Sequence, residues 1–295
     1  MQILWDVISL GRPRQWTKNL IVFAAIIFAG RFTDPESLLQ TVIAFAAFCL
    51  LSSATYMLND TLDFERDRRH PEKRNRPVAA GRIPVWEGYL LAVVTALFAL
   101  TVSWFVSPVG LGFLWVALLY LALTTSYSIW LKHIVILDVL AISFGYVLRA
   151  VAGAVAINVE ISPWLIICTL LVTLFVALAK RRAEIANMED EAENHRAALE
   201  HYSLDLLDQM VAVVTASTVV SYCLYTVDER TLQVVGTDKL VYTVPFVLYG
   251  IFRYLYLMHE KKLGGEPEKV LFSDGPMVAT MLLYAASVIV ILYLF

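Results

Sequence analysis

The sequence is short of cysteine and of charged residues. Only 17% of its 295 residues are charged, and its three cysteines, Cys49, Cys168 and Cys223, all fall in apolar stretches. Their spacing matches neither a disulfide framework nor a metal site, so we interpret them as small core residues. The first eighteen residues lack the basic start and the small-residue cleavage site of a signal peptide. These shortages argue against a disulfide scaffold and against a soluble domain.

What the chain has in excess is apolar residues. They make up 59% of the sequence, the mean hydropathy is +0.68, and many runs approach the roughly 20 residues that a helix needs to cross a bilayer. Since this leaves no room for a separate soluble domain, we predict a single all-α integral membrane domain over residues 1–295, with 1–18 as an interfacial helix. Nine transmembrane helices are predicted, at 19–31, 38–59, 86–106, 109–128, 134–157, 163–180, 206–226, 240–258 and 277–294.

The distribution of Lys and Arg predicts the orientation of these helices. If the N-terminus and the loops after even-numbered spans share one side, only Arg31, Arg230 and Lys239 fall on the other side, and Arg149 lies within a span. The positive-inside rule then places the N-terminus in the cytoplasm and, with nine spans, the C-terminus outside. We predict a multi-pass protein of the cell (inner) membrane. The net charge of −3 is uninformative by itself, and no nucleic-acid partner is expected.

The most informative stretch follows the second predicted span and reads Asn-Asp-Thr-Leu-Asp-Phe-Glu-Arg-Asp over 59–67. If the helix continues, each residue turns about 100°, which places Asp67 and Asp63 within about 60° of Asp60. Asn59 lies about 100° from Asp60 on the same side. Three carboxylates on one arc repel one another unless a cation lies among them. Oxygen ligands of this kind suit Mg²⁺, which stays partly hydrated and bridges to substrate phosphates.

A basic run with Lys73, Arg74 and Arg76 comes soon after the acids. Acids next to cations predict a metal–diphosphate site at the membrane surface. The alternative is a solvated helix end, although solvation does not require acids repeated on one helix face. Three further polar clusters lie on the same predicted cytoplasmic side, at 127–133, 180–184 and 261–268. The lysines of the last cluster are explained most simply by topology and by anionic lipid headgroups.

Arg149 stands apart because it lies deep within a predicted span, where a charge is costly and normally faces a polar cavity or a partner. Asp138 is eleven residues earlier and points to nearly the same side of the helix, about 16 Å away along the axis. The two are too far apart to pair, so we predict that both line one cavity that opens toward the cytoplasm. The alternative for Arg149 is a structural ion pair with another helix.

These motifs resemble the UbiA superfamily of intramembrane transferases. The resemblance rests on the nine spans, on Asn-Asp-x-x-Asp-x-x-x-Asp after span two, and on Tyr-Ser-x-x-Leu-Lys before span five. It implies a UbiA-like helical bundle with a cytoplasm-facing active-site cavity. It also implies that Mg²⁺ and a diphosphate leaving group bind at the first motif, with Lys132 as a further diphosphate contact. The implied metal ligands are Asn59, Asp60, Asp63 and Asp67, and the last three are the implied catalytic residues.

The chain departs from the superfamily pattern after span six. Most members that prenylate aromatic rings carry a second Asp-x-x-x-Asp motif there, whereas this chain has Lys-Arg-Arg-Ala-Glu at 180–184. That departure resembles a narrower branch, the decaprenyl-phosphate phosphoribosyltransferases. Further motifs similar to that branch lie at 12–19, 70–81, 148–153 and 265–268.

The branch resemblance implies transfer of 5-phosphoribose from phosphoribosyl diphosphate (PRPP) to a polyprenyl phosphate, among membrane lipids. Because three phosphate-bearing groups meet in such a site, several cations are needed, and these replace the second acidic motif. The predicted substrate contacts are Lys18, Lys73, Arg76, Tyr127, Lys132, Arg149, Lys180, Arg181 and Glu184.

Two other functions remain open at this point. One is prenyl transfer from a prenyl diphosphate to an aromatic or lipid acceptor, with Glu184, Glu189 and Asp190 as substitute ligands. The other is solute transport, although transporters place polar sites at the midplane, often between internal repeats. Here the charges crowd one face, and no repeat is clear. The length of the lipid chain and homo-oligomerisation are equally open.

Overall fold

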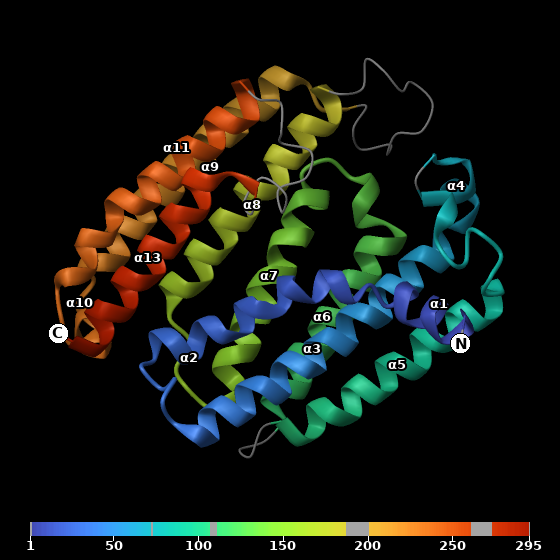
Figure 1. Cartoon of the computed structure of the whole chain (residues 1–295), viewed down its shortest axis with the longest axis horizontal. Coiled ribbons are helices and arrows are strands. Elements are labelled where there is room, and N and C mark those ends of the chain that lie inside the picture. The colour runs from blue at the N-terminus through green and yellow to red at the C-terminus, as the bar shows by residue number, and fades with distance from the viewer. Residues whose placement is uncertain (1, 72, 107–110, 187–200, 261–272, 295) are drawn as a thin grey trace. The chain divides into compact units, whose positions relative to one another are not determined.

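The computed structural model describes residues 2–71, 73–106, 111–186, 201–260 and 273–294 (Figure 1). Every regular element in these ranges is a helix, which confirms the all-α prediction. Eight of the described helical segments are long and apolar enough to cross a membrane, so the chain is an integral membrane protein. The chain folds as two compact units, the first ending at Ile161 and the second beginning at Ser162. The single domain over residues 1–295 and the count of nine spans stay predictions.

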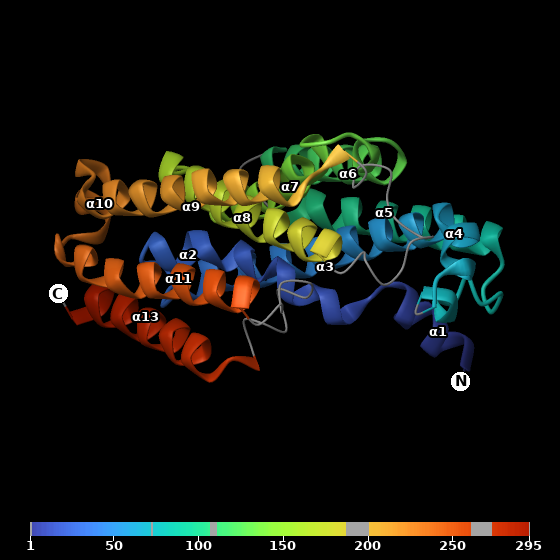
Figure 2. The ribbon, with the colours of Figure 1, turned by 90° about the horizontal axis from the view of Figure 1, so that it is seen from above.

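The first unit is built around one long buried helix. Its main helices are α1 (Gln2–Leu10), α2 (Ala24–Phe28), α3 (Pro35–Leu62), α4 (Phe64–Arg69), α5 (Val85–Val106), α6 (Gly112–Ile129) and α7 (Leu137–Ala156). Short 3₁₀ helices join them: η1 (Pro13–Phe23), η2 (Lys73–Asn75) and η3 (Leu131–His133). Asp34 caps the start of α3 by accepting from the Ser37 backbone N–H at 3.1 Å, with Pro35 in the first turn. Small residues such as Ala44 and Ala47 let neighbouring helices approach α3, and α5 lies along it in both views (Figures 1 and 2).

The first predicted span, 19–31, differs from the expected α-helix. Residues Pro13–Phe23 form a 3₁₀ helix, and only Ala24–Phe28 are α-helical. A 3₁₀ helix rises about 2.0 Å per residue, so η1 and α2 together reach about 30 Å, close to the thickness of a hydrocarbon core. The segment packs closely on α7, because a Cβ added at Gly153 would lie 2.0 Å from the carbonyl oxygen of Val22. Glycine is therefore required where η1 crosses α7.

The second unit consists of α8 (Pro163–Ala186), α9 (Leu204–Val227), α10 (Glu229–Val235), η6 (Lys239–Thr243), α11 (Val244–Glu260) and α13 (Gly275–Leu294). Ser203 caps α9 by accepting from the Leu206 backbone N–H at 3.2 Å. The pairs α8–α9 and α11–α13 run side by side (Figure 2). Arg253 of α11 forms two hydrogen bonds with Asp274, of 2.8 and 3.0 Å, just before α13. The helix predicted over 163–180 runs on to Ala186, so Lys180 and Arg181 lie on α8 itself.

Candidate functional site

The acidic stretch lies at a break between two helices of the first unit. Helix α3 ends at Leu62, Asp63 has φ −92° and ψ 8°, and α4 begins at Phe64. Helix-like hydrogen bonds still cross the break: the Asp63 N–H donates to the Asn59 carbonyl at 3.0 Å, and the Asp67 N–H donates to the Asp63 carbonyl at 2.9 Å. The two helices are therefore joined by hydrogen bonds across Asp63, and α4 leaves the end of α3 in a different direction (Figure 1).

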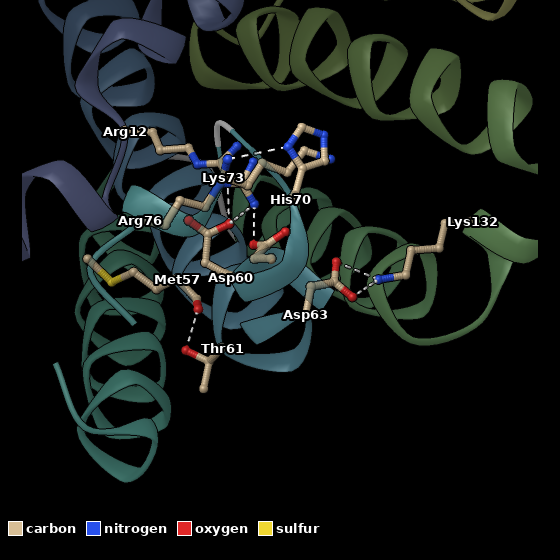
Figure 3. Close-up of polar contacts among 10 residues, drawn as sticks. Arg12, Met57, Asp60, Thr61, Asp63, His70, Lys73, Arg76 and Lys132 are labelled. Carbon is tan, nitrogen blue, oxygen red and sulfur yellow. Dashed lines mark hydrogen bonds and ion pairs between the residues drawn. The ribbon is translucent and has the colours of Figure 1, made fainter. Parts of the chain in front are cut away.

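Asp60 and Asp67 are both buried, with 2% and 3% of their surface exposed. One atom joins them: Arg76 Nη1 donates to Asp60 Oδ1 at 3.0 Å and to Asp67 Oδ2 at 2.6 Å. Arg12 forms a second, very short ion pair with the same Asp60 oxygen (Figure 3). Buried carboxylates are stable only when they are paired in this way. The two carboxylates therefore share the guanidinium of Arg76, and Asp60 also pairs with Arg12.

Asp63 turns toward a different cation. Both of its oxygens accept from Lys132 Nζ, at 2.7 and 2.9 Å. Lys132 belongs to η3, the short turn between α6 and α7, and its side chain is buried. Figure 3 shows Asp63 and Lys132 to one side of the group that holds Asp60, Arg12 and Arg76. Lys132 is thus paired directly with Asp63 of the acidic motif, and its predicted contact with a diphosphate stays a prediction.

The prediction that the three acids share one arc is wrong in one respect, because Asp63 pairs with Lys132, whereas Asp60 and Asp67 share Arg76. No cluster of three or more acidic, His or Cys side chains suited to a metal occurs in the described part of the chain. A pair of carboxylates nevertheless fits Mg²⁺, which uses one or two carboxylates together with waters and substrate phosphates. Asp60 and Asp67 already face a shared positive group, and half-buried Asn59 precedes Asp60.

The remaining predicted contacts divide between the two units. The first unit contains half-buried Lys18, Lys73 and Tyr127 in addition to Arg76 and Lys132. The second contains the basic end of α8, where Arg181 Nη1 donates to Glu184 Oε2 at 2.6 Å. Arg181 is 1% exposed, whereas Lys180 is exposed. Glu189 and Asp190, the proposed substitute ligands, lie outside the described residues, as do Lys261, Lys262 and Lys269.

Arg149 is held by neutral partners. Its Nε donates to Asn19 Oδ1 and its Nη2 to Tyr120 Oη, both at 2.7 Å. The guanidinium also stacks on Tyr120 and Tyr146, 4.8 and 5.0 Å from the ring centroids. The alternative of an ion pair with another helix is thus replaced by hydrogen bonds to η1 and α6. Asp138 is buried near the start of α7, and a cavity shared with Arg149 stays a prediction.

Two residues of this network were not predicted as site residues. Arg12 reaches Asp60 from 48 positions away, in a left-handed conformation with φ 50° and ψ 60°. Such a conformation is costly for a residue other than glycine and tends to occur at functional sites. Asn19 connects Arg149 to Ser52 of α3, to which its Nδ2 donates at 3.1 Å. Both residues belong to the motif at 12–19, which was the only signal for them in the sequence.

Comparison with known proteins places the chain in a family. Residues 20–273 match the UbiA prenyltransferase family, and the chain belongs to it, so it is a membrane transferase of that family. A UbiA homologue from Archaeoglobus fulgidus, solved with GPP and Mg²⁺ bound, superposes with a TM-score of 0.74 at 17% identity, covering 97% of this chain and 99% of that one. That likeness confirms the UbiA-like fold.

Two relatives in the family are similar over most of their length. The decaprenyl-phosphate phosphoribosyltransferase of Corynebacterium glutamicum is 35% identical and covers 98% of this chain and 87% of its own. The enzyme of the same name from Mycobacterium tuberculosis is 33% identical and covers 96% of this chain and 92% of its own. The resemblance to this branch is thus confirmed across nearly the whole chain.

Proposed function

We propose that this membrane transferase moves 5-phosphoribose from PRPP to a polyprenyl phosphate of the decaprenyl type, releasing diphosphate, with Mg²⁺ as cofactor. The observation that carries the proposal is the charge at the end of α8. Where the superfamily pattern has a second acidic motif, Lys180, Arg181 and Arg182 stand, and the nearby Glu184 is engaged by Arg181 at 2.6 Å. A donor with an extra phosphate accounts for this reversal of sign. The similarity to relatives of that name supports the same donor.

The acidic end of α3 has the composition to hold the metal. Asp60 and Asp67 would supply two carboxylates, with Asp63 and Asn59 next to them. When bound there, Mg²⁺ neutralises charge on the leaving diphosphate. Arg12, Arg76 and Lys132 are placed at the same acids, so they are the cations nearest to that diphosphate. Guanidinium groups bind phosphates through paired hydrogen bonds.

The reaction needs no strong base. The bond from the ribose C1 to the diphosphate oxygen breaks, the sugar carbon develops oxocarbenium character, and a phosphate oxygen of the lipid forms the new bond to C1. That oxygen is already anionic near pH 7. The chain therefore has to bind and orient anions, which cationic side chains at a helix end can do. We place this site on the cytoplasmic side, with the N-terminus in the cytoplasm, the C-terminus outside, and the lipid tail along the apolar helices.

The test offers purified enzyme in detergent two labelled donors, PRPP and a prenyl diphosphate, with a polyprenyl phosphate and an aromatic acceptor in parallel. We expect a lipid-linked phosphoribose product only from PRPP, and no product after chelation with EDTA until Mg²⁺ is restored. Formation of a prenylated aromatic product, without any use of PRPP, would instead assign the chain to prenyl transfer. Normal transfer by Asp63→Asn would remove Asp63 from the metal assignment.

A further inference from the structure

The acids at the end of α3 already have positive partners before any substrate binds. Arg76 Nη1 lies between Asp60 and Asp67, and Arg12 contacts the same Asp60 oxygen. Lys132 holds both oxygens of Asp63. Each of the three acids is thus paired with at least one cation. A divalent cation added to this arrangement meets carboxylates whose facing oxygens are occupied.

From this geometry we propose that Arg76 competes with the divalent cation for the Asp60–Asp67 pair, and that the diphosphate of the donor relieves the competition by drawing the guanidinium away. The proposal rests on the proposed function, because it takes the ligand of the freed guanidinium to be a diphosphate. Arg76 would then have two successive roles. It binds the two carboxylates in the empty site and phosphate oxygens once donor and metal are bound.

The distances from Arg76 to Asp60 and Asp67 indicate that a divalent cation would replace the Arg76 guanidinium rather than bind beside it. Asp60 Oδ1 and Asp67 Oδ2 lie 3.0 and 2.6 Å from one and the same nitrogen, so a cation that bridges these two oxygens has to displace Arg76. Like charges at such a separation repel strongly in a partly buried site. Arg12 adds to the competition at Asp60. Lys132 does the same, separately, at Asp63.

Arg76 is also placed so that it can leave. It follows η2, where its backbone N–H donates to the Lys73 carbonyl at 3.0 Å, and a quarter of its side-chain surface is exposed. A divalent cation that binds without donor would displace the Arg76 guanidinium and leave it without an anionic partner. A cation that arrives with a diphosphate supplies that anion. The two ligands should therefore favour each other's binding, which is a coupling between metal and donor through one side chain.

The test measures binding of Mn²⁺, used as a paramagnetic probe, by electron paramagnetic resonance on full-length protein in detergent without donor. We expect Arg76→Gln to bind Mn²⁺ about tenfold more tightly than the wild type, because the competent state no longer has to be freed from an ion pair. Inorganic diphosphate should bind Arg76→Gln more weakly than it binds the wild type. One substitution thus shifts the two affinities in opposite directions.

Arg74→Gln is the matched control, since Arg74 is an exposed cation of the same turn and its loss changes the net charge equally. We expect its Mn²⁺ affinity to stay within about twofold of the wild type, because distant charges are screened. Equal Mn²⁺ affinity in Arg76→Gln and Arg74→Gln, or weaker binding in the former, would overturn the proposal. If Arg76→Gln does not fold, Arg12→Gln takes its place, with a smaller gain in affinity expected and no gain refuting the competition.

The outcome also separates this proposal from the proposed function. Tighter Mn²⁺ binding by Arg76→Gln without any use of PRPP by the wild type would keep the competition and reject the phosphoribosyl donor. Normal phosphoribosyl transfer by the wild type, with no gain of Mn²⁺ affinity in either arginine variant, would keep the donor and reject the competition.

Discussion

The charged ends of α3 and α8 differ in how far along the chain their ion-pair partners lie. At α3 the partners come from far along the chain, 48 positions for Arg12 with Asp60 and 69 for Lys132 with Asp63. At α8 the pairs are closer in sequence, with Arg181 bound to Glu184 one turn away and Arg182 to Asp208 of the next helix at 2.5 Å. The first arrangement joins several segments of its unit, whereas the second stabilises a helix end and its neighbour. An acidic site assembled from distant cations can be rearranged by a ligand.

The largest effect should come from the acids of the first unit. We expect Asp60→Asn to lower the transfer rate by a factor of about 10² to 10³, because removal of one electrostatic group at a reacting centre has that magnitude. Asp67→Asn should behave alike, since both oxygens share Arg76. Initial rates with labelled PRPP measure the effect. Asp6→Asn is the control, because Asp6 forms its ion pair with a different cation, Arg82, at 2.7 Å. The transfer rate of this variant should change little.

Packing should also differ between the units. Gly153→Ala forces a Cβ to within 2.0 Å of the Val22 carbonyl, so we expect a loss of about 1–3 kcal/mol in stability, as for overpacked cores. In the second unit, a Cβ at Gly250 meets no atom within 4 Å, and Gly250→Ala should be neutral or slightly stabilising because alanine favours a helix. Thermal unfolding in detergent measures both. Equal melting temperatures for the two variants would show that η1 does not pack on α7 as described.

Lys180, at the basic end of α8, should affect the binding of the donor rather than the stability of the fold. We expect Lys180→Gln to raise the KM for PRPP about tenfold, because the variant loses one charge-assisted contact to the donor. The melting temperature should stay unchanged, because Lys180 is exposed. Lys239→Gln removes the same charge from η6 in the second unit and serves as the control. If both lysine variants keep the wild-type KM, the cations of α8 do not bind the donor.

The smallest effect concerns pH. The hydrogen bonds from Arg253 lower the pKa of Asp274 below its ordinary value, and the bond from the Met277 N–H acts in the same direction. A carboxyl with a lowered folded-state pKa contributes stability that is present above its unfolded pKa of about 3.9 and is lost as the pH falls through the folded value. Wild type should thus be more stable than Asp274→Asn near neutral pH, and the difference should begin to shrink below about pH 4 and vanish only below the lowered folded-state pKa. A constant difference down to pH 3 would contradict this linkage.

The sequence allowed most of the fold to be predicted, because runs of apolar residues near 20 in length have few alternatives in a membrane chain. Seven of the predicted spans needed only small shifts of their ends, but the end of α8 was placed six residues too early, since charges at 180–184 look like a loop. The form of 19–31 could not be predicted, because a 3₁₀ helix of eleven residues is rare.

The sequence singled out the acids of 59–67 and Lys132 as site residues, and their roles toward metal and diphosphate stay predictions. The ion pair between Asp63 and Lys132 was not predicted. The division of the acids was not expected, because it depends on their cationic partners, Arg76 for Asp60 and Asp67 and Lys132 for Asp63, which helix periodicity does not contain. The role of Arg12 was missed because contacts over 48 positions come from tertiary packing.

The 3₁₀ form of η1 has one more consequence. With three residues per turn, side chains three positions apart are stacked in a single row, which here contains Trp16, Asn19 and Val22. Trp16 donates to Ser53 at 3.0 Å and Asn19 accepts from Arg149 at 2.7 Å, so the row is in contact with both α3 and α7. Inserting one residue between Trp16 and Asn19 would rotate Trp16 by about 120° relative to Asn19, so the two could no longer contact α3 and α7 together. The spacing of η1 is therefore as restrictive as its composition, and a period of three is the signal by which such a segment can be sought in other sequences.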